Sequence, residues 1–170
     1  MKRCDVFSQA YRPGALAKLG FGHADVHALR PGIVCASMNA FGYSGPWKMR
    51  RGFDTVVQSA SGMAYVSGRG KEPKFTPVSS LDYIGGYLMT FGVLVALKRR
   101  AVEGGSYAVN VSLGRCEEWL HTLGMFDIAT ADSGVEELQE IANWLTEVDT
   151  PLGRLTRLRP IVKYSDYSLN

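Results

Sequence analysis

Cysteine is scarce in this chain of 170 residues. Its three cysteines, Cys4, Cys35 and Cys116, are too few and too far apart for a disulfide framework. None lies in a Cys-x-x-Cys pair, the pattern typical of zinc sites and thioredoxin-like redox centres. We therefore expect free thiols, no metal cofactor, and a reducing, cytoplasmic compartment.

Long apolar runs are missing as well. The N-terminus carries Lys2 and Arg3 with no apolar stretch behind them, which is not the pattern of a secretory signal. The strongest apolar run, 84–97, has about 14 residues including three glycines, fewer than the ~20 that a membrane span requires. We interpret this run as part of a long buried central helix in a protein that does not enter a membrane.

The chain has enough apolar residues for a core. Hydrophobic residues make up 46% of it and charged residues 21%, a balance that excludes intrinsic disorder and fits one folded domain. The net charge is +3, but residues 1–85 hold 11 Lys and Arg against 5 Asp and Glu. No helix-turn-helix, zinc-finger or RNP-type pattern accompanies these cations, so we expect a phosphorylated small molecule as partner and no nucleic acid.

Helical and strand patterns alternate along the chain, which predicts an α/β fold with mostly parallel strands. Buried strands are predicted over 33–39 and 107–112, and an exposed or edge strand over 151–160. Helices are predicted over 13–20, 24–29, 53–63, 81–102 and 113–125, and a short one ends at Trp144.

We divide the chain into an α/β region, 1–125, and a C-terminal helix and strand segment, 126–170, that packs on the same domain. Residues 127–140 are acidic and weakly apolar, as in a solvated connection.

Taken by themselves, several residue pairs give weak chemical signals. His23 and His27 have the spacing of a metal-binding pair, but the glutamate of the H-E-x-x-H motif is absent, and a solvated helix is the simpler interpretation. Cys116 and His121 lie five residues apart, which does not make them face each other on a helix. Ser44 lacks the G-x-S-x-G spacing of a hydrolase nucleophile, so hydrolysis is disfavoured.

A basic loop follows the glycine-rich segment 41–46. Its cations are Lys48, Arg50 and Arg51. They can bind phosphate through charge-assisted hydrogen bonds, or they can simply be solvated.

Asp82 lies at the start of the long apolar helix. Backbone N–H groups and the helix dipole stabilise a carboxylate there, so Asp82, with Ser79 and Ser80, is also a candidate helix cap. Gly85 and Gly86 follow, and each weakens the helix by roughly 1 kcal/mol relative to alanine. Close approach by a ligand or another helix would explain that cost.

Four segments occur in an informative order: 7–20 with Tyr-Arg-Pro-Gly, 30–46 with Phe-Gly-Tyr-Ser-Gly-Pro, 52–62 with Gly-Phe-Asp and a later Gln, and 81–105. They resemble the N-F-R-P-G segment, the G-F-G-x-x-G-P loop, the G-x-D-x-x-x-Q-x-x-S-G helix and the D-x-x-x-G helix of family III CoA-transferases, the CaiB/BaiF family. The resemblance runs from about residue 5 to residue 125. It implies a Rossmann-like family III fold, here incomplete.

The resemblance implies covalent catalysis on an acyl-CoA substrate. In the family, the aspartate at the position of Asp82 attacks an acyl-CoA thioester. An aspartyl anhydride and then an aspartyl-CoA thioester form before CoA passes to an acceptor carboxylic acid. Asp82 is therefore the expected catalytic residue.

The same resemblance implies a binding site for coenzyme A. Arg12 and Lys18 fall where family members place cations near CoA, with Ala10 and Tyr11 beside them. Ala10 replaces the family's asparagine. The basic loop supplies further candidates for the CoA phosphates.

Phe53 separates two activities within this family. Racemases of the family use a histidine at this position, paired with the catalytic aspartate, to move a proton. Phe53 cannot accept a proton, so we expect CoA transfer rather than epimerisation, and we place Phe53 among the residues around the cofactor.

Family members are longer, begin with a nucleotide-binding βαβ segment before the matched region, and form interlocked dimers. We therefore expect a homodimer or a companion chain for this one. Two hypotheses follow. Either the protein transfers CoA through Asp82, or it is a non-catalytic family fragment that serves oligomerisation or partner binding.

Overall fold

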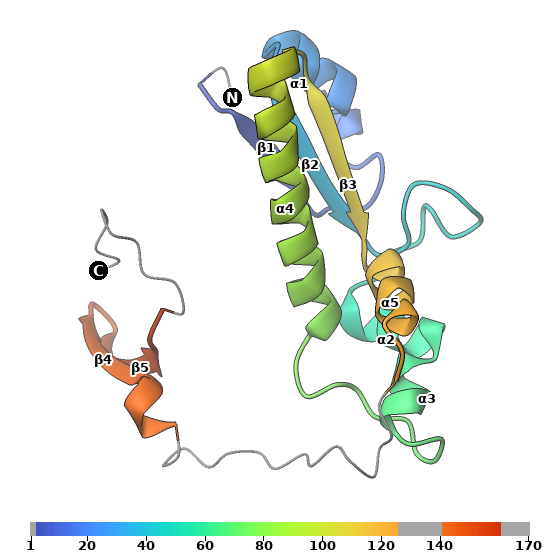
Figure 1. Ribbon diagram of the computed structural model, residues 1–170, viewed down its shortest axis with the longest axis vertical. Coiled ribbons are helices and arrows are strands. Elements are labelled where there is room, and N and C mark those ends of the chain that lie inside the picture. The colour runs from blue at the N-terminus through green and yellow to red at the C-terminus, as the bar shows by residue number, and fades with distance from the viewer. Residues whose placement is uncertain (1–2, 126–140, 161–170) are drawn as a thin grey trace. The chain divides into compact units, whose positions relative to one another are not determined.

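The structure is a computed structural model that describes residues 3–125 and 141–160 (Figure 1). The chain divides into two compact units, Met1–Phe126 and Asp127–Asn170. The first unit contains all the residues predicted to carry chemistry.

A three-stranded sheet organises the first unit. Its strands are β1 (Val6–Gln9), β2 (Val34–Asn39) and β3 (Tyr107–Ser112), and they lie in that order. Both pairings are parallel, with Val34 opposite Val6 on one side and Tyr107 on the other. The predicted α/β fold with parallel strands is confirmed. Strand β1 escaped prediction because its four residues give too short a pattern.

Helices connect these strands. They are η1 (Ala17–Leu19), α1 (His23–Leu29), α2 (Asp54–Ser61), α3 (Met63–Ser67), α4 (Ser80–Glu103) and α5 (Leu113–Thr122). The predicted helix over 13–20 is wrong, since only a three-residue 3-10 turn forms there. The predicted helix over 53–63 ends earlier, because Gly62 adopts a left-handed φ of 88° and separates α2 from α3.

The two faces of the sheet are covered by different helices, as a parallel sheet requires. Cys35 of β2 packs with Val26 of α1 and with Phe7 on one face. Met38, on the alternate face of β2, packs against the cluster that contains Leu81 of α4 and Cys116 of α5. Strand β2 is therefore the buried centre of the unit.

Helix α4 differs from the prediction of a buried central helix. It has 24 residues, of which only Leu81, Gly85 and Ala96 are buried, while Tyr87 is 71% exposed. It lies along β3 and β2 with one face, and the opposite face is left open by the described residues of the first unit (Figure 1). By length and composition alone, α4 is also long and apolar enough to cross a membrane, which corrects the statement that the run is too short.

The second unit contains η3 (Ala142–Trp144) and a hairpin of β4 (Leu145–Thr150) and β5 (Gly153–Leu158). The strands are antiparallel, with Val148 opposite Leu155. The strand predicted over 151–160 is confirmed, β4 was missed, and the helix predicted to end at Trp144 is only the three-residue η3. The predicted connection over 127–140 lies outside the described residues.

Candidate functional site

The carboxyl ends of the three strands define one edge of the sheet. Parallel strands end together, and ligands of open α/β sheets bind beside those ends. Gln9, Asn39 and Ser112 are the last residues of β1, β2 and β3. Helix α4 runs opposite to β3 and begins at this same edge, next to α2 and α5 (Figure 1).

The glycine-rich loop turns sharply after β2. Gly42 and Gly45 have φ values of 80° and 77°, in the left-handed region that glycine adopts without strain. The Asn39 side chain steadies this turn, since its Oδ1 accepts a hydrogen bond from the Gly42 N–H at 2.5 Å. The loop therefore has a defined shape at the end of β2.

The basic loop has one member held in place by an aromatic ring. The Arg50 guanidinium lies 4.6 Å from the centre of the Trp47 ring, within cation–π range. Trp47 in turn meets Phe41 edge to face, with the ring centres 5.1 Å apart. Lys48 and Arg51 are exposed.

A small pocket of about 160 Å³ lies at the end of β1. Gln9, Arg12, His23 and Tyr43 contribute to its lining. Arg12 is thus a predicted cofactor residue that borders a cavity, with its side chain exposed. Lys18 in η1 and the pair Ala10 and Tyr11 are exposed and lie outside the lining of this pocket.

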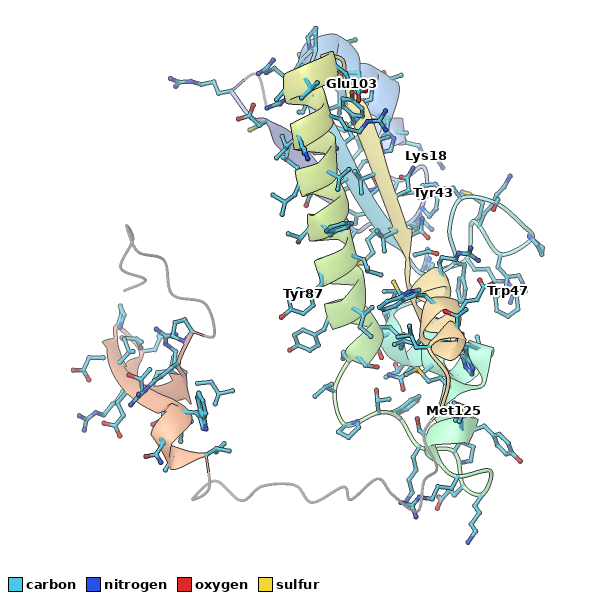
Figure 2. All side chains as sticks on the ribbon, viewed as in Figure 1. Lys18, Tyr43, Trp47, Tyr87, Glu103 and Met125 are labelled. Atoms are coloured by element: carbon cyan, nitrogen blue, oxygen red, sulfur yellow. The ribbon has the colours of Figure 1, made fainter. Side chains whose placement is uncertain are left out.

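A larger pocket of about 770 Å³ lies at the end of β3. Its walls include Tyr43, Trp47, Asn110, Cys116 and Trp119. Tyr43 borders both pockets, and Figure 2 shows Tyr43 and Trp47 on one side of the sheet. Sequence reasoning did not single out Tyr43, although it occupies a variable position of the quoted glycine loop.

His23 has a structural partner. Its Nε2 lies 2.9 Å from the Ser37 hydroxyl, and burial together with the nearby His27 lowers the pKa of His23. The two imidazole rings are 6.3 Å apart, centre to centre. Within residues 3–125 and 141–160, no cluster of three or more metal-ligating side chains forms, and His23 and His27 remain a pair.

Asp82 is exposed in the first turn of α4, but it does not cap its own helix. The cap comes from Asp54 in α2, whose Oδ2 accepts hydrogen bonds from the N–H groups of Leu81 at 2.8 Å and Asp82 at 3.2 Å. Ser79, at the N-cap position, makes no side-chain capping bond. The predicted capping by α4's own side chains is therefore wrong.

Asp54 belongs to a buried polar network. Its side chain is 2% exposed, and its Oδ1 accepts from the Gln58 amide. Gln58 is fully buried and exchanges two 3.0 Å hydrogen bonds with Thr76, one through the Thr76 backbone N–H and one through the hydroxyl. Asp54 and Gln58 occupy the D and Q positions of the pattern in 52–62, and the pattern by itself predicts no role for either side chain.

The environment of Asp82 makes its carboxyl a weaker acid. Partial burial raises the pKa of Asp82, and the negative charge of Asp54 raises it further. A more basic carboxylate is a better nucleophile. The raised pKa therefore suits Asp82 as a covalent nucleophile.

The two glycines after Asp82 have different surroundings. A Cβ on Gly85 would lie 2.8 Å from the Met38 sulfur, so Gly85 lets α4 approach β2. A Cβ on Gly86 would meet nothing within 4 Å. The predicted close approach is therefore explained by the sheet at Gly85, while Gly86 faces open space.

The predicted site residues form two groups. Arg12 and the basic loop lie after β1 and β2, whereas Asp82 lies at the start of α4 with Asp54. Asp82 lines neither of the two pockets described above, and no hydrogen bond or ion pair within the described part of the chain joins it to a predicted cation. Phe53, 64% exposed, precedes Asp54 at the start of α2.

Comparison with known proteins gives a consistent family match. Residues 1–143 match the model described as CoA-transferase family III. An acetyl-coenzyme A transferase, nodX of Hypoxylon pulicicidum, is 35% identical over 131 residues, which cover 72% of this chain and 22% of that protein. The succinyl-CoA–L-malate CoA-transferase beta subunit of Chloroflexus aurantiacus is 33% identical over 129 residues, 72% of this chain and 32% of that subunit.

Solved structures are also similar to this chain. The crystal structure of Rv3272 from Mycobacterium tuberculosis superposes with a TM-score of 0.66 at 31% identity, covering 72% of this chain and 35% of that one. A CAIB/BAIF family protein from Brucella suis shares the fold, with a TM-score of 0.64 at 23% identity over 90% of this chain and 42% of that one. This chain spans between about a fifth and a third of the two curated relatives.

Proposed function

Because this chain belongs to CoA-transferase family III, we propose that it carries the nucleophilic half of a site that transfers CoA between an acyl-CoA and a carboxylic acid. The observation that supports the proposal best is the position of Asp82. Its carboxylate is exposed at the start of α4, its pKa is raised, and the resemblance places the family's catalytic aspartate there.

The proposed chemistry proceeds on the Asp82 carboxylate. An oxygen of Asp82 attacks the thioester carbonyl, a C–O bond forms, the C–S bond breaks, and CoA leaves as a thiolate. The thiolate then attacks the Asp82 carbonyl of the anhydride and releases the first carboxylate, which leaves an aspartyl-CoA thioester. An acceptor carboxylate repeats the two steps in reverse and carries CoA away.

Arg12 and the basic loop are the proposed CoA-binding residues. Arg12 lines the pocket at the end of β1, and Arg50 is held over Trp47. Guanidinium groups bind phosphate oxygens through paired, charge-assisted hydrogen bonds. Lys18, Ala10 and Tyr11, which lie in or before η1, and Phe53, which precedes α2, are exposed and remain proposed contacts.

Trapping of the covalent intermediate tests this function. The full chain is incubated with acetyl-CoA or succinyl-CoA without an acceptor acid, and intact mass and peptide mapping are used to find a CoA adduct on Asp82. Hydroxylamine should release CoA from the thioester. Asp82→Asn should form no adduct, because its amide is not a nucleophile toward thioesters.

Glu72→Gln is the matched control, since Glu72 is another exposed carboxyl of the same unit. It should react like the parent chain. An adduct that persists in Asp82→Asn would overturn the assignment of the nucleophile.

A second candidate function is association with another chain, supported by the open face of α4. Tyr83, Tyr87, Phe91 and Leu94 follow helical spacing along this face and are each at least 60% exposed. Figure 2 shows Tyr87 pointing away from the sheet. The Chloroflexus relative is named a beta subunit, which favours a companion chain or a second copy over a lone monomer.

Sedimentation of the purified chain tests association. A dimer that dissociates in Tyr87→Glu but persists in Lys71→Glu, whose exposed lysine lies before α4, would support this face as the contact. A monomeric chain that forms the Asp82 adduct would show that chemistry needs no such contact.

A further inference from the structure

The start of α4 is held by a residue from another helix. Asp54 lies 28 positions before Asp82, in α2, and its Oδ2 accepts from both the Leu81 and the Asp82 backbone N–H. Free N–H groups at a helix start are usually satisfied by nearby side chains of the same segment or by water. Here the partner comes from a separate element and is buried.

Both oxygens of Asp54 are engaged. The Gln58 amide donates to Oδ1, while the two backbone groups of α4 donate to Oδ2. Gln58 is itself fixed by Thr76, whose hydroxyl lies 3.0 Å from the Ser80 hydroxyl. The network therefore joins α2, the segment before α4 and the first turn of α4 into one hydrogen-bonded unit.

We infer that Asp54 is the positioning residue for Asp82: its buried carboxylate fixes the first turn of α4, so that the Asp82 side chain is presented outward in a constant orientation. This role rests on the proposed CoA transfer through Asp82. Asp54 is 2% exposed and need not touch the substrate. It acts through the backbone of the nucleophile.

Asp54 also sets the charge around Asp82. Its negative charge adds to burial in raising the pKa of Asp82. On α5, which packs against both α2 and α4, Arg115 pairs with Glu118 and His121 lies 2.5 Å from Glu117. Asp54 is therefore the charged group through which the fold acts on Asp82 among the described residues.

Two substitutions separate position from charge. Asp54→Asn keeps a side-chain oxygen that can accept from the α4 N–H groups but removes the charge, whereas Asp54→Ala removes both. Val57→Ala is the control, because Val57 is 1% exposed on the same helix and packs in the core cluster that contains Leu81, but takes no part in the hydrogen bonds at the start of α4. All three variants are made in the full chain.

Three readouts are measured: hydrogen exchange of the Leu81 and Asp82 amides, the Asp82 carboxyl titration by carbon NMR, and the rate of adduct formation with acetyl-CoA. In Asp54→Ala, we expect faster amide exchange and a rate about 100-fold lower, the usual effect of a misplaced reacting group. In Asp54→Asn, the Asp82 titration should move to lower pH with a smaller loss of rate. Val57→Ala should lower thermal stability and leave all three readouts near the parent values.

The positioning role is overturned if Asp54→Ala shows the amide exchange and the rate of adduct formation of the parent chain. It is also overturned if Val57→Ala lowers the rate of adduct formation as much as Asp54→Ala does. Absence of any adduct in the parent chain would instead overturn the proposed CoA transfer. The amide exchange and the titration then still decide whether Asp54 fixes and polarises Asp82, since neither needs a reaction.

Discussion

A Cβ placed on Gly92 of α4 would lie 2.7 Å from Cγ1 of Val109 in β3. Real carbon atoms do not approach this closely without a shift of the helix or the strand. Val109 has a β-branched side chain with one strongly preferred rotamer and cannot easily turn away. Gly92 therefore lets α4 lie directly on β3, as Gly85 lets it approach β2.

Gly92→Ala should consequently destabilise the protein. Overpacking costs about 1–3 kcal/mol, and the better helix propensity of alanine returns less than about 1 kcal/mol. We expect a net loss of roughly 1–2 kcal/mol in the free energy of unfolding, measured by urea denaturation. Gly86→Ala, where a Cβ meets nothing within 4 Å, should be neutral or stabilising. Equal effects of the two substitutions would contradict the packing argument.

Asp82→Asn should change how stability depends on pH. The pKa of Asp82 is raised in the folded chain, so the folded state binds this proton more tightly than the unfolded state. The stability due to this group is complete below the ordinary value of about 3.9 and falls as pH rises through the folded pKa. Asp82→Asn should thus be more stable than the parent at pH 7 and equally stable at pH 3, by denaturant titration. If the gain in the free energy of unfolding were larger at pH 3 than at pH 7, the pKa of Asp82 would be lowered rather than raised by folding.

His27→Gln should make the chain less sensitive to acid. The pKa of His23 is lowered by burial and, in addition, by His27, so the folded state favours neutral His23. Stability from this group is present above the ordinary value of about 6.5 and is lost as pH falls through the folded pKa. Removing His27 brings the pKa of His23 in the folded chain closer to its pKa in the unfolded chain. Thermal melts at pH 5 and pH 8 should differ less in His27→Gln than in the parent.

The elements of the first unit that follow strong local patterns could be predicted from the sequence. The compact apolar run became β2, the alternation at 107–112 became β3, and the glycines at 104 and 105 marked the end of α4. Strand β1 could not be assigned, since pairing with β2 rather than local pattern determines it. The proline and glycine around 13–20 predicted a helix, but only the three-residue η1 forms there.

The candidate site was only half visible in the sequence. A family resemblance pointed to Asp82, because its motif is contiguous. Its partner Asp54 could not be recognised as a cap, because the contact joins residues 28 positions apart and depends on how α2 packs beside α4. The exposure of α4 could not be predicted either. An apolar run indicates that a helix tends to be buried, but it does not tell whether another element covers each face of that helix.

Arg12→Ala should weaken binding of CoA more than removal of any single cation of the basic loop. Arg12, Lys48 and Arg51 are all exposed. Arg12 also borders the pocket that Tyr43 and His23 line, whose walls exclude water from one side of a bound phosphate. Lys48 and Arg51 border neither of the two pockets described above, so their attraction is screened by salt. Loss of a charged hydrogen bond typically costs about 1.5–3 kcal/mol, which corresponds to a dissociation constant raised roughly tenfold or more. Calorimetric titrations at low and high salt distinguish the two groups.

The loss of CoA affinity in Arg12→Ala should persist at high salt, whereas the loss of CoA affinity in Lys48→Ala should disappear. Lys98→Ala, on the far part of α4, is the control and should bind CoA like the parent. If Arg12→Ala also binds CoA like the parent while Lys48→Ala does not, the phosphates lie along the glycine-rich loop, and the pocket at the end of β1 is not their site.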